Sequence, residues 1–384
     1  MKAAVFYGAK DFRIENVEDP KIETEDILIK VRAAGICGSD LHAYKEGLFS
    51  RRGFVMGHEV AGEVVEAGAK VKGIKVGDRV SPMMYGLYDT SAACGKCFWC
   101  TRGQPQWCSS AGHKACGECG PCKTGEWWLC ESNQRHMLMG YSKNGGYAEY
   151  AYVPYAKLGY NVFKIPGNLS YEEASFLDPV TGAYKWVNQG EPRSWETGVV
   201  TGLGTIGLTV MQVLKLYVSK VIVSDVSEKR LKLAKELGAD VVINAAKEDP
   251  LKKVMELTGT GRSVSGKGGG CADIVMECSG VPFVMQQAVE MVRTGGRIVL
   301  VGLFEHDVAL NMNHIIHKQL SLISSFSPGK QPANVDIREA LELMAEGKVK
   351  VKPMISHEFP LDQTMEAFEI QTKADQSVKV IINP

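Results

Sequence analysis

The pattern of apolar and polar positions gives the first part of the chain the character of a β domain. Within the first 165 residues, alternating or β-branched runs such as 27–31 and 60–65 are separated by turns rich in glycine. Alternation with a period of two is typical of strands that bury one face. We therefore expect an antiparallel, barrel-like domain. Mixed patterning returns from about residue 326, with a predicted helix over 335–346 and a closing strand over 377–382.

The middle of the chain alternates between short buried strands and amphipathic helices. Between Ile206 and Tyr217 the apolar residues recur at helical spacing, and Ser227 can cap a helix over 228–237 that Gly238 ends. This alternation predicts a doubly wound parallel sheet. Its predicted strands cover 199–201, 221–223, 241–243, 274–276 and 298–301.

Composition narrows the class of protein. The chain has 384 residues, a length that favours two domains, and 45% of them are apolar. Lys and Arg together number 44, as do Asp and Glu, so the basic excess of a nucleic-acid-binding protein is missing. Charges at Lys10 and Asp11 interrupt the N-terminal apolar run too early for a signal peptide, and apolar runs are too short to span a membrane. We expect a cytoplasmic protein with no nucleic-acid or membrane partner.

A glycine-rich turn stands between a predicted strand and a predicted helix, where it predicts a dinucleotide site. The motif is Gly202-Leu-Gly-Thr-Ile-Gly207, and Asp225 ends the next strand. Its glycines let the backbone approach a pyrophosphate, and the carboxylate accepts hydrogen bonds from ribose hydroxyls and repels a 2′-phosphate, which favours NAD. The alternative is a glycine-rich turn in an unrelated α/β protein. Candidate cofactor-binding residues are Gly202, Gly204, Thr205, Ile206, Gly207, Asp225 and Arg230.

A second glycine-rich stretch, 259–270, imitates the start of a P-loop. It lacks the Ser or Thr that would follow Lys267, and no predicted helix comes after it. We interpret it as a flexible insertion.

Eleven cysteines in a chain without a signal peptide favour metal ligation over disulfides. Two quartets share one spacing, and four thiolates at that spacing predict a closed tetrahedral zinc site. Cys271 and Cys278 are interpreted as ordinary buried thiols. The first quartet is Cys94, Cys97, Cys100 and Cys108, and the second is Cys116, Cys119, Cys122 and Cys130.

Two short motifs contain the residue types of a catalytic zinc site. They are Cys37-Gly-Ser-Asp-Leu-His42 and Gly57-His-Glu59. Cys37 and His58 offer sulfur and nitrogen ligands, and Glu59 is either a third ligand or one that exchanges with water. Taken alone, a cysteine and a distant histidine are more often core residues than ligands.

These motifs stand in a familiar order, and the whole chain resembles the zinc-containing medium-chain dehydrogenase/reductase family, in its branch of sorbitol, butanediol and threonine dehydrogenases. The resemblance implies a GroES-like, β-rich catalytic domain (about 1–179 plus 326–384) with an inserted Rossmann domain (about 180–325). The matching segments are the two motifs above, Gly77-Asp-Arg-Val80, the cysteine-rich stretch, Gly145-Gly-Tyr-Ala-Glu149, Asp178-Pro179, the glycine-rich turn and Thr294-Gly-Gly-Arg297.

The resemblance also implies residue roles. Cys37, His58 and Asp178 would hold the catalytic zinc, with Glu59 beside them. Asp40 would orient His58. Ser39 would accept the proton of the substrate hydroxyl, and His42 would pass that proton to solvent.

The resemblance predicts one structural zinc site, whereas this chain has two quartets. The second quartet is closer to the family pattern, because Lys123, Gly125 and the segment 129–131 match it, and we assign the structural zinc there. The first quartet either binds another zinc or is a redundant or redox-active insertion. An iron–sulfur cluster is disfavoured by the spacing.

The predicted activity is zinc-dependent transfer of a hydride from a secondary alcohol or polyol to NAD, in a homodimer or homotetramer. An amino-alcohol substrate of the threonine type is an alternative, because Asp178-Pro179 is typical of threonine dehydrogenases. The alternative from another class is a catalytically silent relative that acts as a scaffold or redox sensor. The joint presence of Cys37, His58, Asp178 and Ser39 argues against silence.

Overall fold

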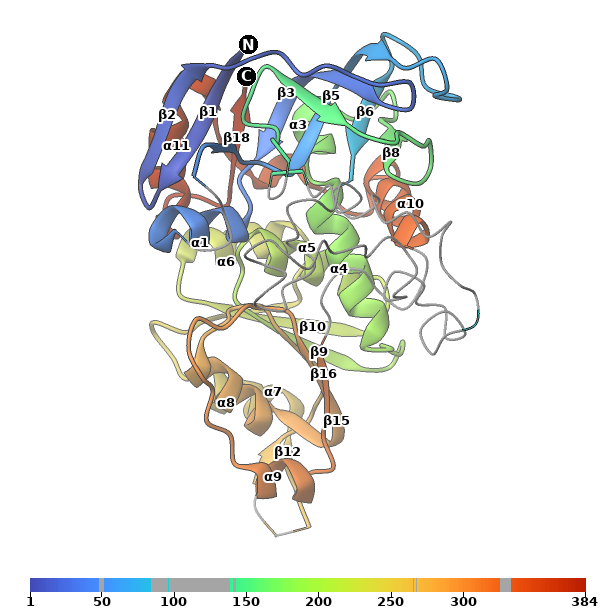
Figure 1. Cartoon of the computed structure of the whole chain (residues 1–384). Coiled ribbons are helices and arrows are strands. Elements are labelled where there is room, and N and C mark those ends of the chain that lie inside the picture. Colours follow the sequence, from blue (N-terminus) through green and yellow to red (C-terminus); the bar gives the residue numbers. More distant parts are fainter. Residues whose placement is uncertain are drawn as a thin grey trace.

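The chain builds two units (Figure 1): one is antiparallel except for the parallel pair β17–β18 and is called the antiparallel unit, and the other is parallel. Both chain ends lie in the antiparallel unit, where strand β18 near the C-terminus pairs with strand β3 from the N-terminal part. The computed structural model describes residues 1–47, 52–83, 96, 139–140, 143–264, 266, 268–324 and 333–384.

The antiparallel unit contains a three-stranded sheet in the order β2-β1-β4 and a seven-stranded sheet. The larger sheet runs β17-β18-β3-β5-β6-β8, and β7 also pairs with β3. The strands are β1 (Lys2–Gly8), β2 (Asp11–Asn16), β3 (Ile27–Gly35), β4 (Phe54–Val55), β5 (Glu59–Ala67), β6 (Arg79–Pro82), β7 (Tyr150–Val153), β8 (Val162–Lys164), β17 (Ile355–Pro360) and β18 (Lys379–Asn383).

The pairing of β3 with β5 sets the geometry of this unit. Alternate residues Ile27, Ile29 and Val31 of β3 are fully buried, as a period of two requires. The two strands pair so closely that a Cβ atom on Gly62 would lie 2.3 Å from the carbonyl oxygen of Lys30. The predicted antiparallel domain is therefore confirmed.

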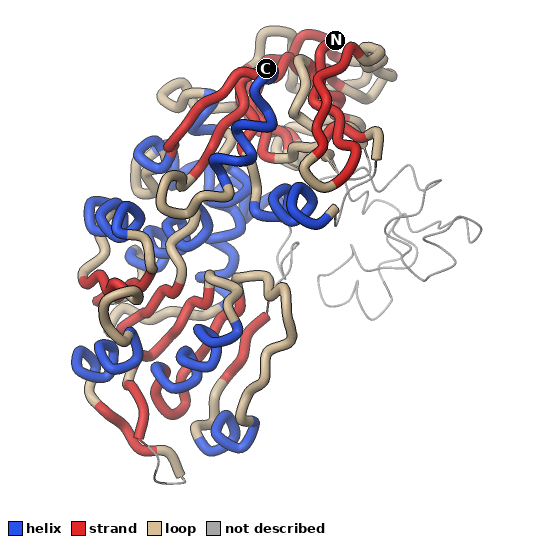
Figure 2. Tube along the Cα trace, turned by 90° about the vertical axis from the view of Figure 1, so that its left-hand side faces the viewer, coloured by secondary structure: helices blue, strands red, loops and turns tan. Residues whose placement is uncertain are grey.

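The parallel unit is a six-stranded sheet in the order β11-β10-β9-β14-β15-β16, with helices on both faces (Figure 2). The strand order reverses direction between β9 and β14, as in doubly wound folds, so the predicted sheet is confirmed. The strands are β9 (Thr197–Thr201), β10 (Lys220–Asp225), β11 (Val241–Asn244), β14 (Ala272–Glu277), β15 (Val292–Leu300) and β16 (Ser321–Ser324).

Neighbouring residues in these strands point to different cores. Val199 and Val275 belong to the buried cluster that includes α8, whereas Val200 and Met276 belong to the cluster that includes α4 and α5. A parallel sheet covered on both faces needs apolar side chains at consecutive positions. This requirement explains why these strands read as continuous apolar runs in the sequence.

Helices connect the strands and join the two units. Helix α4 packs against α5 and α10, and Ser227 caps α6 as expected, accepting a hydrogen bond from the Arg230 amide. The predicted domain boundaries near residues 180 and 325 stay a prediction. The helices are α1 (Gly38–Glu46), α3 (Tyr171–Ala174), α4 (Leu177–Gln189), α5 (Thr205–Lys215), α6 (Glu228–Glu236), α7 (Pro250–Thr258), α8 (Pro282–Met291), α9 (Met312–His317), α10 (Ala333–Ala345) and α11 (Thr364–Gln371), with short 3₁₀ turns η6 (Lys352–Met354) and η7 (Leu361–Gln363).

The stretch interpreted as a flexible insertion is instead built around a hairpin. Strands β12 (Thr260–Arg262) and β13 (Gly268–Gly270) pair antiparallel, and the Thr294 hydroxyl donates a hydrogen bond to the Arg262 carbonyl. Of the glycines that imitate a phosphate-binding loop, Gly261 is a residue of β12 and Gly266 lies between the two strands with a φ of 77°. Among the helices of the described residues, none combines the length and the apolar character that crossing a bilayer demands.

The packing at the start of α5 predicts that alanine lowers stability at one glycine and leaves it almost unchanged at another. A Cβ atom on Gly207 would lie 1.8 Å from the carbonyl oxygen of Gly202, whereas one on Gly204 would meet no heavy atom within 4 Å. We expect Gly207→Ala to lower the free energy of unfolding by about 1–3 kcal/mol. The matched control Gly204→Ala should change it by less than about 0.5 kcal/mol. Denaturant unfolding of both variants measures the difference, and equal stability would contradict this packing.

Candidate active site and metal centre

The site begins at the turn that joins β3 to α1. Cys37 precedes the first helical residue, and its amide donates a hydrogen bond of 3.0 Å to Oδ2 of Asp40 in the first turn. An acidic residue at this position satisfies a free amide and interacts favourably with the helix dipole. The Cys37 side chain is thereby held at the end of β3, next to the start of β5.

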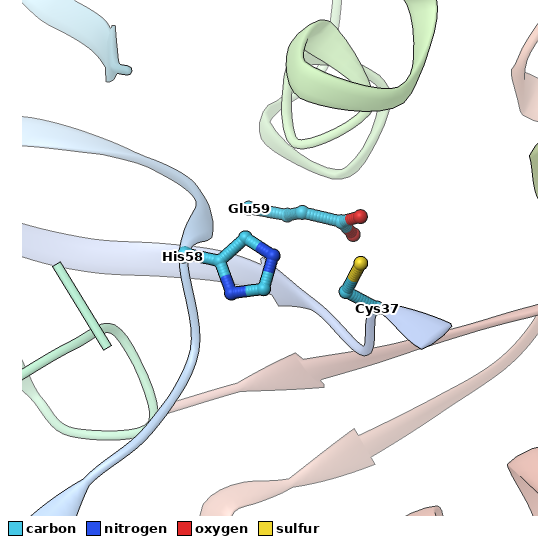
Figure 3. A group of neighbouring side chains, drawn as sticks. All are labelled: Cys37, His58 and Glu59. Atoms are coloured by element: carbon cyan, nitrogen blue, oxygen red, sulfur yellow. The ribbon is translucent and has the colours of Figure 1, made fainter. Parts of the chain in front are cut away.

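Three potential ligands meet there (Figure 3). One donor atom each from Cys37, His58 and Glu59 lies within 4.8 Å of the other two, and the three side chains converge on a common space. His58 and Glu59 are each only 2% exposed to solvent. Sulfur, imidazole nitrogen and carboxylate oxygen form the mixed donor set that zinc accepts in proteins.

Asp40 lies next to His58, the side chain that the resemblance predicts it to orient. Its Oδ1 is 3.6 Å from Nδ1 of His58, and the Tyr147 hydroxyl donates a hydrogen bond of 2.7 Å to its Oδ2. Burial acts to raise the pKa of Asp40, but His58 and the hydrogen bonds from Tyr147 and the Cys37 amide together lower it. Burial, followed by the nearby Asp40 charge, raises the pKa of Tyr147 well above its usual value. Asp40 is thus held as a carboxylate facing His58.

A buried lysine from the far end of the sequence completes the centre. Nζ of Lys379, on β18, forms an ion pair with Oε2 of Glu59 and donates a hydrogen bond of 3.0 Å to the Ile36 carbonyl. Both charged side chains are at most 2% exposed. A Cβ atom on Gly35 would lie within 2.6 Å of atoms of both, so glycine is required beside the pair.

Asp178 is close to this centre but outside the three-residue group. It stands in the first turn of α4. Burial raises the pKa of Asp178 to about 6, opposed by His58 and Lys379 and reinforced by Glu59 and Asp40. The charges of His58, Glu59, Lys379 and Asp40 all act on this carboxyl group, so Asp178 lies near the proposed ligands.

Ser39 and His42 lie on α1 at positions three residues apart, which brings them to the same side of the helix. Both are partly exposed, unlike the buried Asp40 between them. The helix therefore presents its buried carboxylate to His58, whereas Ser39 and His42 lie on its partly exposed side.

The glycine-rich turn has the conformation that a phosphate-binding turn requires. Gly202 has a φ of 83°, which favours glycine, and the helix α5 begins just beyond Gly204. Asp225 accepts hydrogen bonds from the Leu203 amide (2.6 Å) and from the Ser227 amide (2.8 Å). The carboxylate therefore fixes the turn in addition to lying at the end of β10.

Two other predicted cofactor-binding residues contact the antiparallel unit. The Thr205 hydroxyl donates a hydrogen bond of 2.8 Å to the Val378 carbonyl, and the Arg230 guanidinium donates to the Ser377 carbonyl at 3.1 and 3.3 Å. Ile206 packs against the core beside α4. Residues 377 and 378 directly precede Lys379, so the glycine-rich turn is tied to the segment that carries the buried lysine.

Sequence reasoning missed several of these residues. Lys379 had no local signal, because its partner Glu59 lies 320 positions away. Tyr147 lay inside a matching segment without an assigned role. Glu277 ends β14, where a doubly wound sheet binds ligands. Its buried carboxylate accepts hydrogen bonds from the amides of Ser279 (2.9 Å) and Gly280 (3.2 Å).

Both cysteine quartets lie outside the described residues, so their zinc sites stay predictions. Cys271 and Cys278 are described and form no disulfide, but both are only partly buried rather than fully buried as predicted. Burial nevertheless raises the pKa of the Cys278 thiol well above its usual value.

Comparison with known proteins identifies the family. Residues 23–115 match the alcohol dehydrogenase GroES-like domain, and residues 205–346 match the zinc-binding dehydrogenase domain. The chain is 34% identical to L-threonine 3-dehydrogenase of Pyrococcus furiosus over 99% of this chain and 97% of that protein. It is 31% identical to sorbitol dehydrogenase of Bacillus subtilis, over 100% and 97%.

Among solved structures, 2R,3R-butanediol dehydrogenase from Bacillus subtilis superimposes with a TM-score of 0.77 at 28% identity, covering 100% of this chain and 99% of the other. The chain therefore belongs to the zinc-containing medium-chain dehydrogenase family. Within that family it is a zinc-dependent dehydrogenase of the threonine, sorbitol and butanediol group. The GroES-like and Rossmann-like architecture expected from the resemblance is confirmed.

The buried ion pair gives a stability prediction that does not depend on activity. Lys379→Met leaves the Glu59 carboxylate buried without its cation, so we expect a loss of about 3–5 kcal/mol in the free energy of unfolding. Adding Glu59→Gln to Lys379→Met should restore part of that loss, because the uncompensated charge is removed. Denaturant unfolding of the metal-free proteins measures both. A double variant no more stable than Lys379→Met would contradict this reading.

Proposed function

We propose that the protein transfers a hydride from a secondary alcohol or polyol to NAD at a zinc site held by Cys37, His58 and the carboxylate of Asp178 or Glu59. The observation that carries the proposal is the convergence of Cys37, His58 and Glu59. The hydrogen bond from Thr205 to Val378 supports it, because it links the proposed dinucleotide turn to the residue preceding Lys379.

The residues present fit zinc by their chemistry. Cys37 supplies a thiolate, His58 an imidazole whose other side faces Asp40, and two carboxylates complete the set. Metal-binding histidines commonly have such a carboxylate behind them. Lys379 already balances the Glu59 charge, which favours Asp178 as the third ligand and leaves Glu59 as the carboxylate that exchanges with water.

Each residue has a distinct task in the proposed reaction. Zinc, when bound, lowers the pKa of the substrate hydroxyl. Asp40 orients His58, and Tyr147 holds Asp40. Ser39 accepts the hydroxyl proton, and His42, one helical turn further on, carries it toward solvent. NAD, when bound, would supply the hydride acceptor, and the parallel unit would hold it against the site.

NAD is the proposed cofactor. Gly202, Gly204 and Gly207 provide the turn and the amide end of α5 for a pyrophosphate. Asp225 at the end of β10 supplies the negative charge that disfavours a 2′-phosphate. Because both of its oxygens already accept backbone amides, it is held rigidly where the ribose would bind.

A threonine-type amino alcohol is the second candidate substrate. Asp178-Pro179 supports it, as does the 34% identity to a protein named L-threonine 3-dehydrogenase. We also propose that Cys116, Cys119, Cys122 and Cys130 hold a structural zinc, and that the domains divide near residues 180 and 325.

The zinc proposal predicts the outcome of replacing its thiolate. Cys37→Ser should remove one zinc ion per chain and lower NAD reduction by roughly 100-fold or more, the cost of losing several kcal/mol of charge stabilisation. Elemental analysis and the absorbance of NADH measure the two effects. Full activity with unchanged zinc content would contradict the assignment.

The cysteine quartets provide the matched controls. Cys116→Ser should also lose one zinc ion per chain, but it should lower the melting temperature, because a structural zinc contributes folding free energy. If the first quartet also binds zinc, the chain holds three zinc ions and Cys94→Ser loses one of them. If it does not, the chain holds two and Cys94→Ser keeps both. Unchanged zinc content and melting in Cys116→Ser would overturn the choice of the second quartet.

The choice of NAD predicts the effect of removing one charge. Asp225→Asn keeps one of the two oxygen acceptors for the turn, loses the other, and removes the charge that repels a 2′-phosphate. We expect the preference for NAD over NADP, measured as a ratio of kcat/KM values, to fall by about 1–3 kcal/mol. Asp240→Asn, at the start of the next strand, is the control and should leave the ratio unchanged. An unaltered protein that prefers NADP would show this assignment to be wrong.

A further inference from the structure

One close contact joins helix α1 of the antiparallel unit to a loop of the parallel unit. Nδ1 of His42 lies 3.2 Å from Oε1 of Glu305, which is within hydrogen-bond reach. His42 is on α1, and Glu305 is on the loop that follows β15. The side chain of Glu305 is 46% exposed and that of His42 is 20% exposed.

The loop that carries Glu305 is fixed to the proposed dinucleotide site. Its first two residues, Val301 and Gly302, donate backbone hydrogen bonds of 2.9 and 2.8 Å to the carbonyl of Glu277. A Cβ atom on Gly280 would lie 2.2 Å from the carbonyl oxygen of Leu303, so the loop packs tightly on the turn after β14. That turn also touches the glycine-rich turn, because a Cβ atom on Gly202 would lie 2.8 Å from Cα of Ser279.

Helix α1 is equally well fixed on the other side of the contact. Asp40 is fully buried and holds the helix start through the Cys37 amide, with Tyr147 behind it. Ser39 and His42 lie on one side of this helix, three residues apart. Glu305 therefore approaches the residue that the proposed function already places in the path of the proton.

We propose that Glu305 is a positioning residue that sets the ring of His42 for proton transfer, an inference that rests on the proposed function. With Nδ1–H donated to the Glu305 carboxylate, Nε2 of His42 is the acceptor. As the substrate C–H bond breaks and its electron pair reaches NAD with the hydrogen, the hydroxyl proton passes to Ser39. The proton of Ser39 passes to Nε2 of His42 and then to water. Glu305 stabilises the ring while it is charged and does not itself take up the proton.

An ordinary exposed ion pair is the competing interpretation, and such pairs contribute little to stability. The two interpretations differ in what Glu305 does to the ring of His42. A positioning carboxylate selects one tautomer and changes turnover, as in hydrolases where a carboxylate orients a histidine. A solvated ion pair does neither.

The first experiment measures the ring without any reaction. Protein labelled with ¹⁵N in its histidine rings reports the tautomer of each histidine, and the His42 signals are those absent from His42→Gln. We expect His42 to carry its proton on Nδ1 in the unaltered protein and to lose that preference in Glu305→Ala. Asp307→Ala, two residues away on the same exposed loop, is the matched control and should leave His42 unchanged. Identical His42 signals in Glu305→Ala and the unaltered protein would overturn the proposal.

The second experiment measures turnover with a reactive alcohol and NAD. Glu305→Ala and His42→Gln should each lower kcat by about tenfold, with little change in the KM for NAD. The double variant should be no slower than His42→Gln, because both changes act on one ring. Glu305→Asp should recover part of the loss, and Asp307→Ala should retain full activity. If the kcat losses of the two single variants multiply in the double variant, or if only the KM for NAD changes, Glu305 serves the contact between the two units. Either result would overturn the positioning role.

The two experiments separate the inference from the proposed function. If the unaltered protein reduces NAD but Glu305→Ala is fully active, the role of Glu305 is wrong and the proposed function stands. If no alcohol is oxidised by the unaltered protein, the proposed function fails and the catalytic role of Glu305 fails with it. The tautomer measurement then still decides whether Glu305 sets the ring of His42.

Discussion

The buried carboxylate of Glu59 must have its negative charge neutralised without water, and this requirement constrains the whole active centre. Glu59 stands at the first position of β5, beside the proposed zinc ligand His58, and is 2% exposed. An isolated carboxylate in such a place would cost several kcal/mol, so the fold must bring it a cation. Lys379 is that cation, and it comes from the last strand of the chain. The antiparallel unit therefore has to close with β18 in position before the ligand group is stable.

The same strand couples the metal centre to the parallel unit. Residues 377 and 378 accept hydrogen bonds from Arg230 and Thr205, and the next residue is Lys379. One short segment thus contacts the helix after the glycine-rich turn, the helix after β10 and the buried carboxylate. On the other side of the cluster, Asp40 links His58 to α1. Each of these boundaries is therefore only one or two side chains away from the proposed metal ligands.

Local signals in the sequence predicted the parts of this arrangement that are encoded locally. The glycine-rich turn and the cap at Ser227 each depend on a few adjacent residues, and the structure has them as expected. Cys37 and His58 are distant in the sequence and were grouped only through the family resemblance, and the structure brings them together. Contacts between residues that are far apart in the sequence are not marked by any local sequence pattern. Lys379, Tyr147 and Glu305 acquire their roles only when distant segments meet, because a period of two or 3.6 residues identifies buried faces and not partners. The hairpin at 260–270 was misread for a related reason, since glycine marks turns and tightly packed strands alike.

Removal and return of zinc tests the central claim most directly. The protein would be dialysed against a chelator and assayed for NAD reduction with secondary alcohols, polyols and L-threonine, before and after zinc is added back. The account predicts that at least one of these substrates is oxidised, that the activity disappears with the metal, and that it returns with zinc. Oxidation that persists at full rate in the zinc-free protein, or no oxidation of any substrate by the zinc-loaded protein, would contradict it.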